Sequence, residues 1–237
     1  MTIYRLITNN GAGIDRYGLL NVVAFIIALL TALVLHEIAH GLVALWNGDV
    51  TAKVYGRLSL NPLRHFDIAG LLLMLLVGFG WAKPVPINPN NFKNRKLGAI
   101  TVSIAGIATN LLIALLAAMC LVLFAKIKPQ NESMGYFTYF LAETAYLTAS
   151  LNVTFALFNL LPLYPLDGYR LLSCFVDGNN GAMVFLRRYS LYILLGLLVL
   201  NYLPIVSNYS PLNLYLSKFG GLIEGGFISL WRLIFNV

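Results

Sequence analysis

Residues 19–46 read LLNVVAFIIALLTALVLHEIAHGLVALW, and this stretch decides how the rest of the chain is interpreted. It exceeds the roughly 20 apolar residues that cross the hydrocarbon core of a bilayer, so it predicts a membrane-spanning helix. Its second half nevertheless carries His36, Glu37 and His40. Each ionisable group inside a spanning helix costs about 2.5–3.5 kcal/mol or more, so three of them so close together indicate a functional site.

The spacing of these residues is HExxH. On a helix, positions i and i+4 share a face, so His36 and His40 can bind one Zn²⁺ while Glu37 acts as general base. The alternative is a hydrated helix interface lined by two histidines and a glutamate. The metal site is favoured because a metal ion compensates for the cost of placing these groups in the membrane.

Tetrahedral zinc needs a third protein ligand and an open position for water. Asp167 is the favoured third ligand, since it follows a helix interrupted by Pro162 and Pro165, where freed backbone and a side chain can line a cavity. His65, the remaining histidine, is the alternative ligand.

Composition places the whole chain in the membrane class. Of its 237 residues, 59% are hydrophobic and 11% charged, and the mean hydropathy is +0.79. Soluble domains carry about 25% charged residues, so soluble, disordered and fibrous proteins are excluded. The net charge of +7 is typical of cytoplasmic loops rather than of nucleic-acid binding. Cys120 and Cys174 form no CxxC metal motif.

The sequence predicts one all-α, polytopic membrane domain over residues 1–237, with about five to six membrane-embedded helices. Its catalytic core covers about 19–175 and its C-terminal helices 184–237. Segment 212–235 is glycine-interrupted and charged, so it either spans or lies at the interface. The other predicted spanning helices cover 97–125, 138–163 and 184–206.

The spacing of apolar residues changes over residues 50–60. Apolar and polar residues alternate there, which predicts a short β-hairpin with one apolar face. Gly56 would allow a bend. The hairpin is expected on the cytoplasmic side, either with an exposed edge that binds unwound substrate by strand addition or resting on the bilayer surface.

The distribution of Lys and Arg orients the chain. Basic residues gather between 53 and 96 and again at 170–188, so both regions are expected in the cytoplasm. His36, His40 and Asp167 reach one depth only if an even number of spans separates them. Residues 68–82, too short for an easy crossing, are therefore predicted to form a re-entrant segment.

Five blocks carry a resemblance to a known family over roughly residues 30–175: HEIAHGLVALWNGDVTAK, GRLSLNPLRHFD, GWAKPVPINPNNF, SIAGIATNLL and FNLLPLYPLDGYRLL. Together and in this order they resemble the site-2 protease family (peptidase family M50), in its small branch without PDZ or CBS domains. The departures, such as Asp67-Ile68 where the family often shows Asp-Pro, affect none of the matched ligands and bear on substrate access.

The resemblance implies an intramembrane zinc metalloprotease with one Zn²⁺ per chain. His36, His40 and Asp167 match the zinc ligands, and Glu37 matches the catalytic acid/base. Asn159 matches a polar residue that assists the oxyanion or positions the substrate.

Three further residues are assigned to substrate binding. Gly78 and Gly80 match a membrane-dipping loop that contacts the substrate. Asn110 ends the block that the family often shows as GPLAN, with an interhelical hydrogen bond beside Gly106 as the alternative role.

The expected function is hydrolysis of peptide bonds within or near transmembrane segments. The expected partners are a transmembrane protein or peptide substrate and the lipid bilayer, with no nucleic acid. The protein is expected to be a multi-pass protein of the cell membrane with its active site toward the cytoplasm. Two alternatives remain open: a transporter or ion pathway that uses intramembrane His, Glu and Asp, and a relative that binds membrane segments without cutting them.

Overall fold

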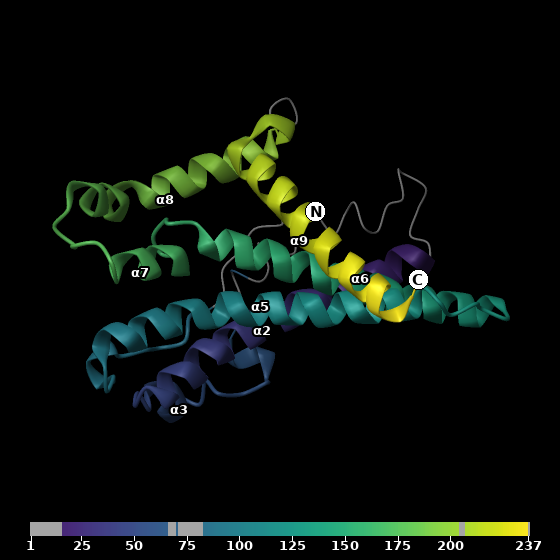
Figure 1. Cartoon of the computed structure of the whole chain (residues 1–237), viewed down its shortest axis with the longest axis horizontal. Helices are drawn as coiled ribbons and strands as arrows, with labels where there is room; N and C mark the ends of the chain where they lie inside the picture. Colours follow the sequence, from purple (N-terminus) through teal and green to yellow (C-terminus); the bar gives the residue numbers. More distant parts are fainter. Residues whose placement is uncertain (1–15, 66–69, 71–82, 204–206, 237) are drawn as a thin grey trace.

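The computed structural model describes residues 16–65, 70, 83–203 and 207–236. Within these ranges all of the regular secondary structure is helical (Figure 1). The long helices are α2 (Arg16–Trp46), α5 (Arg95–Phe124), α6 (Glu132–Leu160), α8 (Gly181–Tyr202) and α9 (Pro211–Phe235), and the short ones are α3 (Thr51–Val54), η1 (Pro62–Arg64), η2 (Pro89–Asn91), α7 (Asp167–Ser173) and η3 (Ser207–Tyr209).

Local capping explains where most of the long helices begin. Asn94, Asn131 and Asn180 each accept a hydrogen bond from a backbone N–H in the first turn of α5, α6 and α8. Ser210 does the same for α9, with Pro211 at the first helical position. Such caps satisfy N–H groups that have no partner within the helix.

The core is formed where α2, α5 and α6 pack against one another (Figure 1). Small residues such as Ala28 on α2 and Ala114 on α5 are fully buried and let the backbones approach closely. Helix α9 lies across α5 and α6. Its Trp231 indole N–H donates to the carbonyl of Leu115 at 2.8 Å, and its Tyr215 hydroxyl donates to the carbonyl of Leu157 at 3.2 Å.

In the part of the chain that the structure describes, three helical stretches are long and apolar enough to cross a membrane: Arg16–Trp46, Arg95–Phe124 and Gly181–Asn201. Three of the predicted spans therefore meet this criterion, compared with the five to six membrane-embedded helices expected. Helix α6 contains many Thr, Asn and Glu residues, and α9 contains Lys218, Glu224 and Arg232. These polar residues lower the hydropathy of both helices.

The hairpin predicted for 50–60 is wrong for this structure, since the described residues contain no strand. Thr51–Val54 is helical, and residues 55–60 form turns and irregular backbone. The alternating apolar residues share no covered face, because Ala52 is fully buried whereas Val54 and Leu60 are more than 70% exposed. The strand edge expected to bind substrate is therefore absent from this part of the chain. The re-entrant segment predicted for 68–82 lies outside the described residues, except for Gly70.

Candidate metal centre

Two imidazole rings meet on the inner face of α2. His36 and His40 lie one helical turn apart, and both are buried. Their Nε2 atoms are 3.0 Å apart, and the rings meet edge to face. The spacing of HExxH therefore gives the shared face that the sequence predicts.

Asp167 reaches the same point from the turn between α6 and α7. Helix α6 ends at Leu160, the chain turns through Pro162 and Pro165, and Asp167 is the first residue of α7. Its Oδ2 lies 3.1 Å from His36 Nε2 and 3.0 Å from His40 Nε2. These are the three residues in the described part of the chain that come together as a possible metal-binding group.

The turn into α7 depends on Gly168. A Cβ atom at this position would lie 2.2 Å from the carbonyl oxygen of Leu160 and 2.5 Å from that of Leu161. Both contacts are with backbone, which cannot move aside as a flexible side chain can. Glycine therefore lets α7 begin against the end of α6 and brings Asp167 to the histidines.

The hydrogen bonds around the cluster bear on what could lie between its three side chains. His40 Nδ1 lies 2.7 Å from the carbonyl oxygen of Val102. Since a carbonyl only accepts, Nδ1–H donates, and in a neutral ring Nε2 then carries a lone pair. That lone pair faces the carboxylate oxygen of Asp167 at 3.0 Å. Two electron-rich atoms at this distance repel each other unless a metal ion or a proton lies between them, so the cluster could hold a metal ion.

The donor set and its spacing suit zinc. Imidazole nitrogen and carboxylate oxygen are zinc ligands, and tetrahedral bonds of about 2.0–2.2 Å place ligand atoms about 3.3–3.5 Å apart. The three observed separations are 3.0, 3.0 and 3.1 Å, a few tenths of an ångström shorter. A carboxylate is ordinarily ionised near neutral pH, so Asp167 is available as an anionic ligand.

Glu37 lies beside the cluster and points toward the loop before α5. Its Oε2 accepts a hydrogen bond from the Val85 N–H at 2.9 Å, and the residue is half-buried. This hydrogen bond fixes one oxygen of the Glu37 carboxylate. The other oxygen of Glu37 has no hydrogen bond among those described, so it can accept a proton.

Gly106 on α5 provides the space for the His36 ring. A Cβ atom there would lie 2.4 Å from Cε1 and 2.6 Å from Nε2 of His36. From the sequence, Gly106 was noticed only as a small neighbour of Asn110, and its contact with His36 was not predicted. A small residue in an apolar helix is the available signal, because such residues mark close helix packing.

Gly106→Ala is therefore expected to displace His36 and to lower zinc affinity by about 10- to 100-fold, the range typical of changes in the residues that orient metal ligands. Zinc affinity of the purified protein, measured by competition with a chelator, checks this. Gly196→Ala on α8 is the matched control, because no described atom lies within 4 Å of the added Cβ. Equal affinity in both variants would contradict the role assigned to Gly106.

The other predicted site residues have different surroundings. Asn159 is half-buried and its amide donates to the carbonyl of Phe155 in its own helix at 3.1 Å. Asn110 is fully buried, and its amide nitrogen and oxygen have no hydrogen-bond partner among the described residues. Gly78 and Gly80 lie outside the described residues. The roles of all four remain predictions.

His65, the alternative metal ligand, lies outside the cluster of His36, His40 and Asp167. The residue is fully buried, and its Nε2 lies 2.7 Å from the carbonyl oxygen of Ser59. This nitrogen therefore donates to backbone. His65 instead helps to hold the turn that follows α3.

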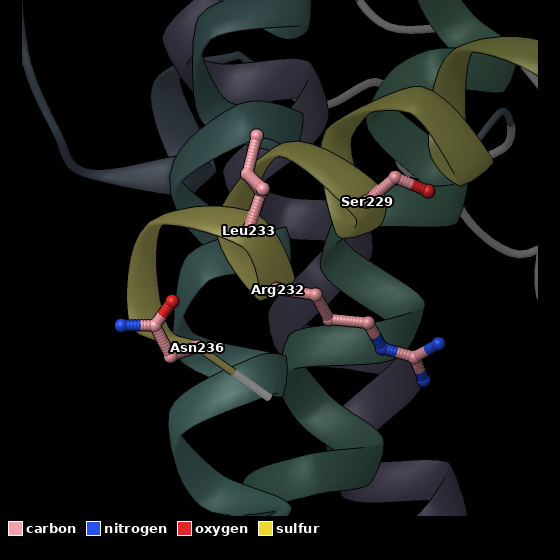
Figure 2. A pocket seen from close by; sticks show the side chains of 4 residues that line it. All are labelled: Ser229, Arg232, Leu233 and Asn236. Atoms are coloured by element: carbon pink, nitrogen blue, oxygen red, sulfur yellow. The ribbon is translucent and has the colours of Figure 1, made fainter.

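A hollow near the end of α9 is lined by Ser229, Arg232, Leu233 and Asn236 (Figure 2). Figure 2 shows these four side chains pointing in different directions, so their polar atoms do not converge on one point. The hollow therefore lacks the convergent polar groups of a specific ligand site.

The chain is similar in sequence to a curated bacterial protein. The chain is 41% identical over 175 residues to "Putative zinc metalloprotease YwhC" of Bacillus subtilis (strain 168), covering 73% of this chain and 79% of the relative. No protein-family model matches the chain. No solved structure matches it significantly.

Proposed function

Because the chain belongs to the family of the Bacillus subtilis protein named putative zinc metalloprotease YwhC, we propose that it is a zinc metalloendopeptidase of the site-2 protease type. It hydrolyses peptide bonds within or near transmembrane segments of membrane proteins or peptides. The observation that carries the proposal is the meeting of His36, His40 and Asp167 at 3.0–3.1 Å on and beside an apolar helix.

The proposed chemistry divides between the metal and the residues around it. When bound by His36, His40 and Asp167, one zinc ion supplies Lewis acidity and lowers the pKa of water toward about 7. Glu37 removes the proton from the attacking water and passes it to the leaving amine. The Val85 N–H holds Glu37 in place through one oxygen and leaves the other free for the proton.

Two asparagines complete the proposed site. Asn159 donates a hydrogen bond to the oxyanion or positions the substrate. Asn110 binds the substrate with its unpaired amide, which is buried within the core. A buried amide without partners is costly, and a peptide backbone supplies both the donor and the acceptor that it lacks.

The depth of the site supports action on membrane segments. His36 and His40 lie in the second half of α2, a helix long and apolar enough to cross a bilayer. The basic residues that follow α2 and α7 favour a cytoplasmic location for this end of the helix. We place the protein in the cell membrane, with its lipid-facing helices in contact with the bilayer, and we propose that helix α6 spans as well.

A reconstituted system tests the proposal. The purified chain in liposomes should cut co-reconstituted single-span membrane peptides, and mass spectrometry should place the cuts within or near their apolar segments. Removal of zinc with a chelator should stop cleavage, and added zinc should restore it. Zinc-dependent ion flux without cleavage would instead favour a transporter. Binding of the peptides without cleavage would favour a non-catalytic relative.

A further inference from the structure

Asp49 is a fully buried carboxylate that lies outside the metal cluster. It follows the end of α2 and is 0% exposed, and no ion pair is described for it. Its oxygens instead accept hydrogen bonds from the N–H and hydroxyl of Thr51, the N–H of Asn88 and the amide of Asn91. Burying a charge costs free energy unless several donors compensate for it. The four donors around Asp49 provide this compensation.

Two of these donors belong to the segment 83–93, which also contacts Glu37. The Asn88 N–H donates to Asp49 Oδ2 at 2.7 Å, and the Asn91 amide donates to Oδ1 at 2.8 Å. The neighbouring Lys93 N–H donates to the carbonyl of Asn47 at 2.8 Å. These contacts fasten one end of the segment 83–93 to the end of α2.

The same segment provides the hydrogen bond to Glu37. Val85 is buried, and its Cγ1 lies 3.4 Å from the position of a Cβ added to Gly41 on α2. Its N–H is 2.9 Å from Glu37 Oε2. Pro84 and Pro86 have no N–H, so Val85 is the one residue of 84–86 that can donate to the carboxylate.

We infer that Asp49 is a positioning residue for Glu37: it holds Asn88 and Asn91, and these keep the Val85 N–H against the Glu37 carboxylate. The inference rests on the proposed function of Glu37. Burial raises the pKa of Asp49, but hydrogen bonds from Thr51, Asn88 and Asn91 outweigh burial and hold that pKa below its ordinary value. The carboxylate therefore stays ionised, and charged acceptors make the stronger hydrogen bonds.

Hydrogen–deuterium exchange tests this connection without any substrate. Deuterium uptake between residues 84 and 86 comes from the Val85 amide alone, because both neighbours are prolines. Asp49→Asn should speed exchange at Val85 and at Asn88 by about tenfold or more, since asparagine has no charge and directs an amide group toward these donors. Glu37→Ala should speed exchange at Val85 and leave Asn88 unchanged.

Asn91→Ala provides a second variant that is milder than a change of the buried charge. It removes one donor to Asp49 and should speed Val85 exchange to a smaller degree. Asn90→Ala is the matched control, because this neighbouring side chain is exposed and no hydrogen bond is described for it. Wild-type exchange at Val85 in both Asp49→Asn and Asn91→Ala would overturn the inference.

Kinetics separate positioning from a general loss of structure. With the membrane peptides cut in liposomes as the probe, Asp49→Asn should lower kcat about tenfold while KM and zinc content stay at wild-type values. A rise in KM with kcat unchanged would overturn the inference. If the wild-type chain cuts no peptide, the proposed function fails, and the exchange experiment still decides whether Asp49 holds Val85.

Discussion

Replacing Glu37 by glutamine should leave zinc bound and lower the rate of peptide cleavage by about 10²- to 10⁴-fold, the contribution typical of a general base. Glutamine has the same shape and keeps an oxygen that accepts from the Val85 N–H, a contact of 2.9 Å in the structure. Its amide cannot take a proton from water. The variant therefore removes the chemistry and preserves the surroundings of the metal ligands.

Two measurements check this result. Elemental analysis of the purified protein should give the same zinc content for Glu37→Gln and wild type. Membrane proteomics should show that uncut membrane proteins or peptides accumulate in cells with the variant. Glu132→Gln is the matched control, because Glu132 is exposed at the start of α6, far along the chain from the cluster. Wild-type turnover by Glu37→Gln would exclude Glu37 as the base.

The long helices could be predicted from sequence because their signals are local. Apolar runs of sufficient length indicated helices at 97–125 and 184–206, close to α5 and α8 as observed. The starts of these helices are set by Asn94 and Asn180, which cap the first turn. A cap depends on residues within a few positions of each other, so neither signal requires knowledge of the rest of the fold.

The cluster of His36, His40 and Asp167 was predictable for a different reason. His36 and His40 follow from helical spacing alone. Asp167 is more than a hundred positions away. It was favoured because it follows a helix interrupted by Pro162 and Pro165, and because the block FNLLPLYPLDGYRLL resembles one that carries a zinc ligand in the site-2 protease family. The structure brings these three side chains together. Helical spacing therefore predicts the two histidines, whereas the prediction of Asp167 depends on the interrupted helix end and on the family resemblance.

The short segments after α2 were not predictable in the same way. Alternation over 50–60 resembles a strand, but the Asp49 carboxylate accepts from the Thr51 N–H and hydroxyl and stabilises the turn by which the chain enters the short helix α3. The Asp-x-Thr spacing was a possible signal for this local turn. The contact between Asp49 and Asn91 depends on tertiary packing, for which the sequence pattern contains no signal.

Replacing Asp167 by alanine should reduce bound zinc from about one ion per chain to less than a tenth of that, with a matching loss of cleavage. Two imidazoles would remain where tetrahedral zinc needs three protein ligands. Both partners of Asp167 Oδ2 lie within 3.1 Å, so the change removes one corner of the cluster. Elemental analysis after dialysis against a weak chelator gives the measurement.

Three further variants show whether the loss of zinc comes from a missing ligand atom, from a missing charge or from a change in a neighbouring residue. Asp167→Asn keeps an oxygen at the same position without its charge, so it should retain more zinc than alanine and less than wild type. Arg170→Ala should keep the zinc, because Arg170 is half-exposed and 3.8 Å from Asp167 Oδ1. His65→Ala should also keep it, since the ring donates to Ser59. Full zinc content in Asp167→Ala together with loss in His65→Ala would assign the third ligand to His65 and remove Asp167 from the site.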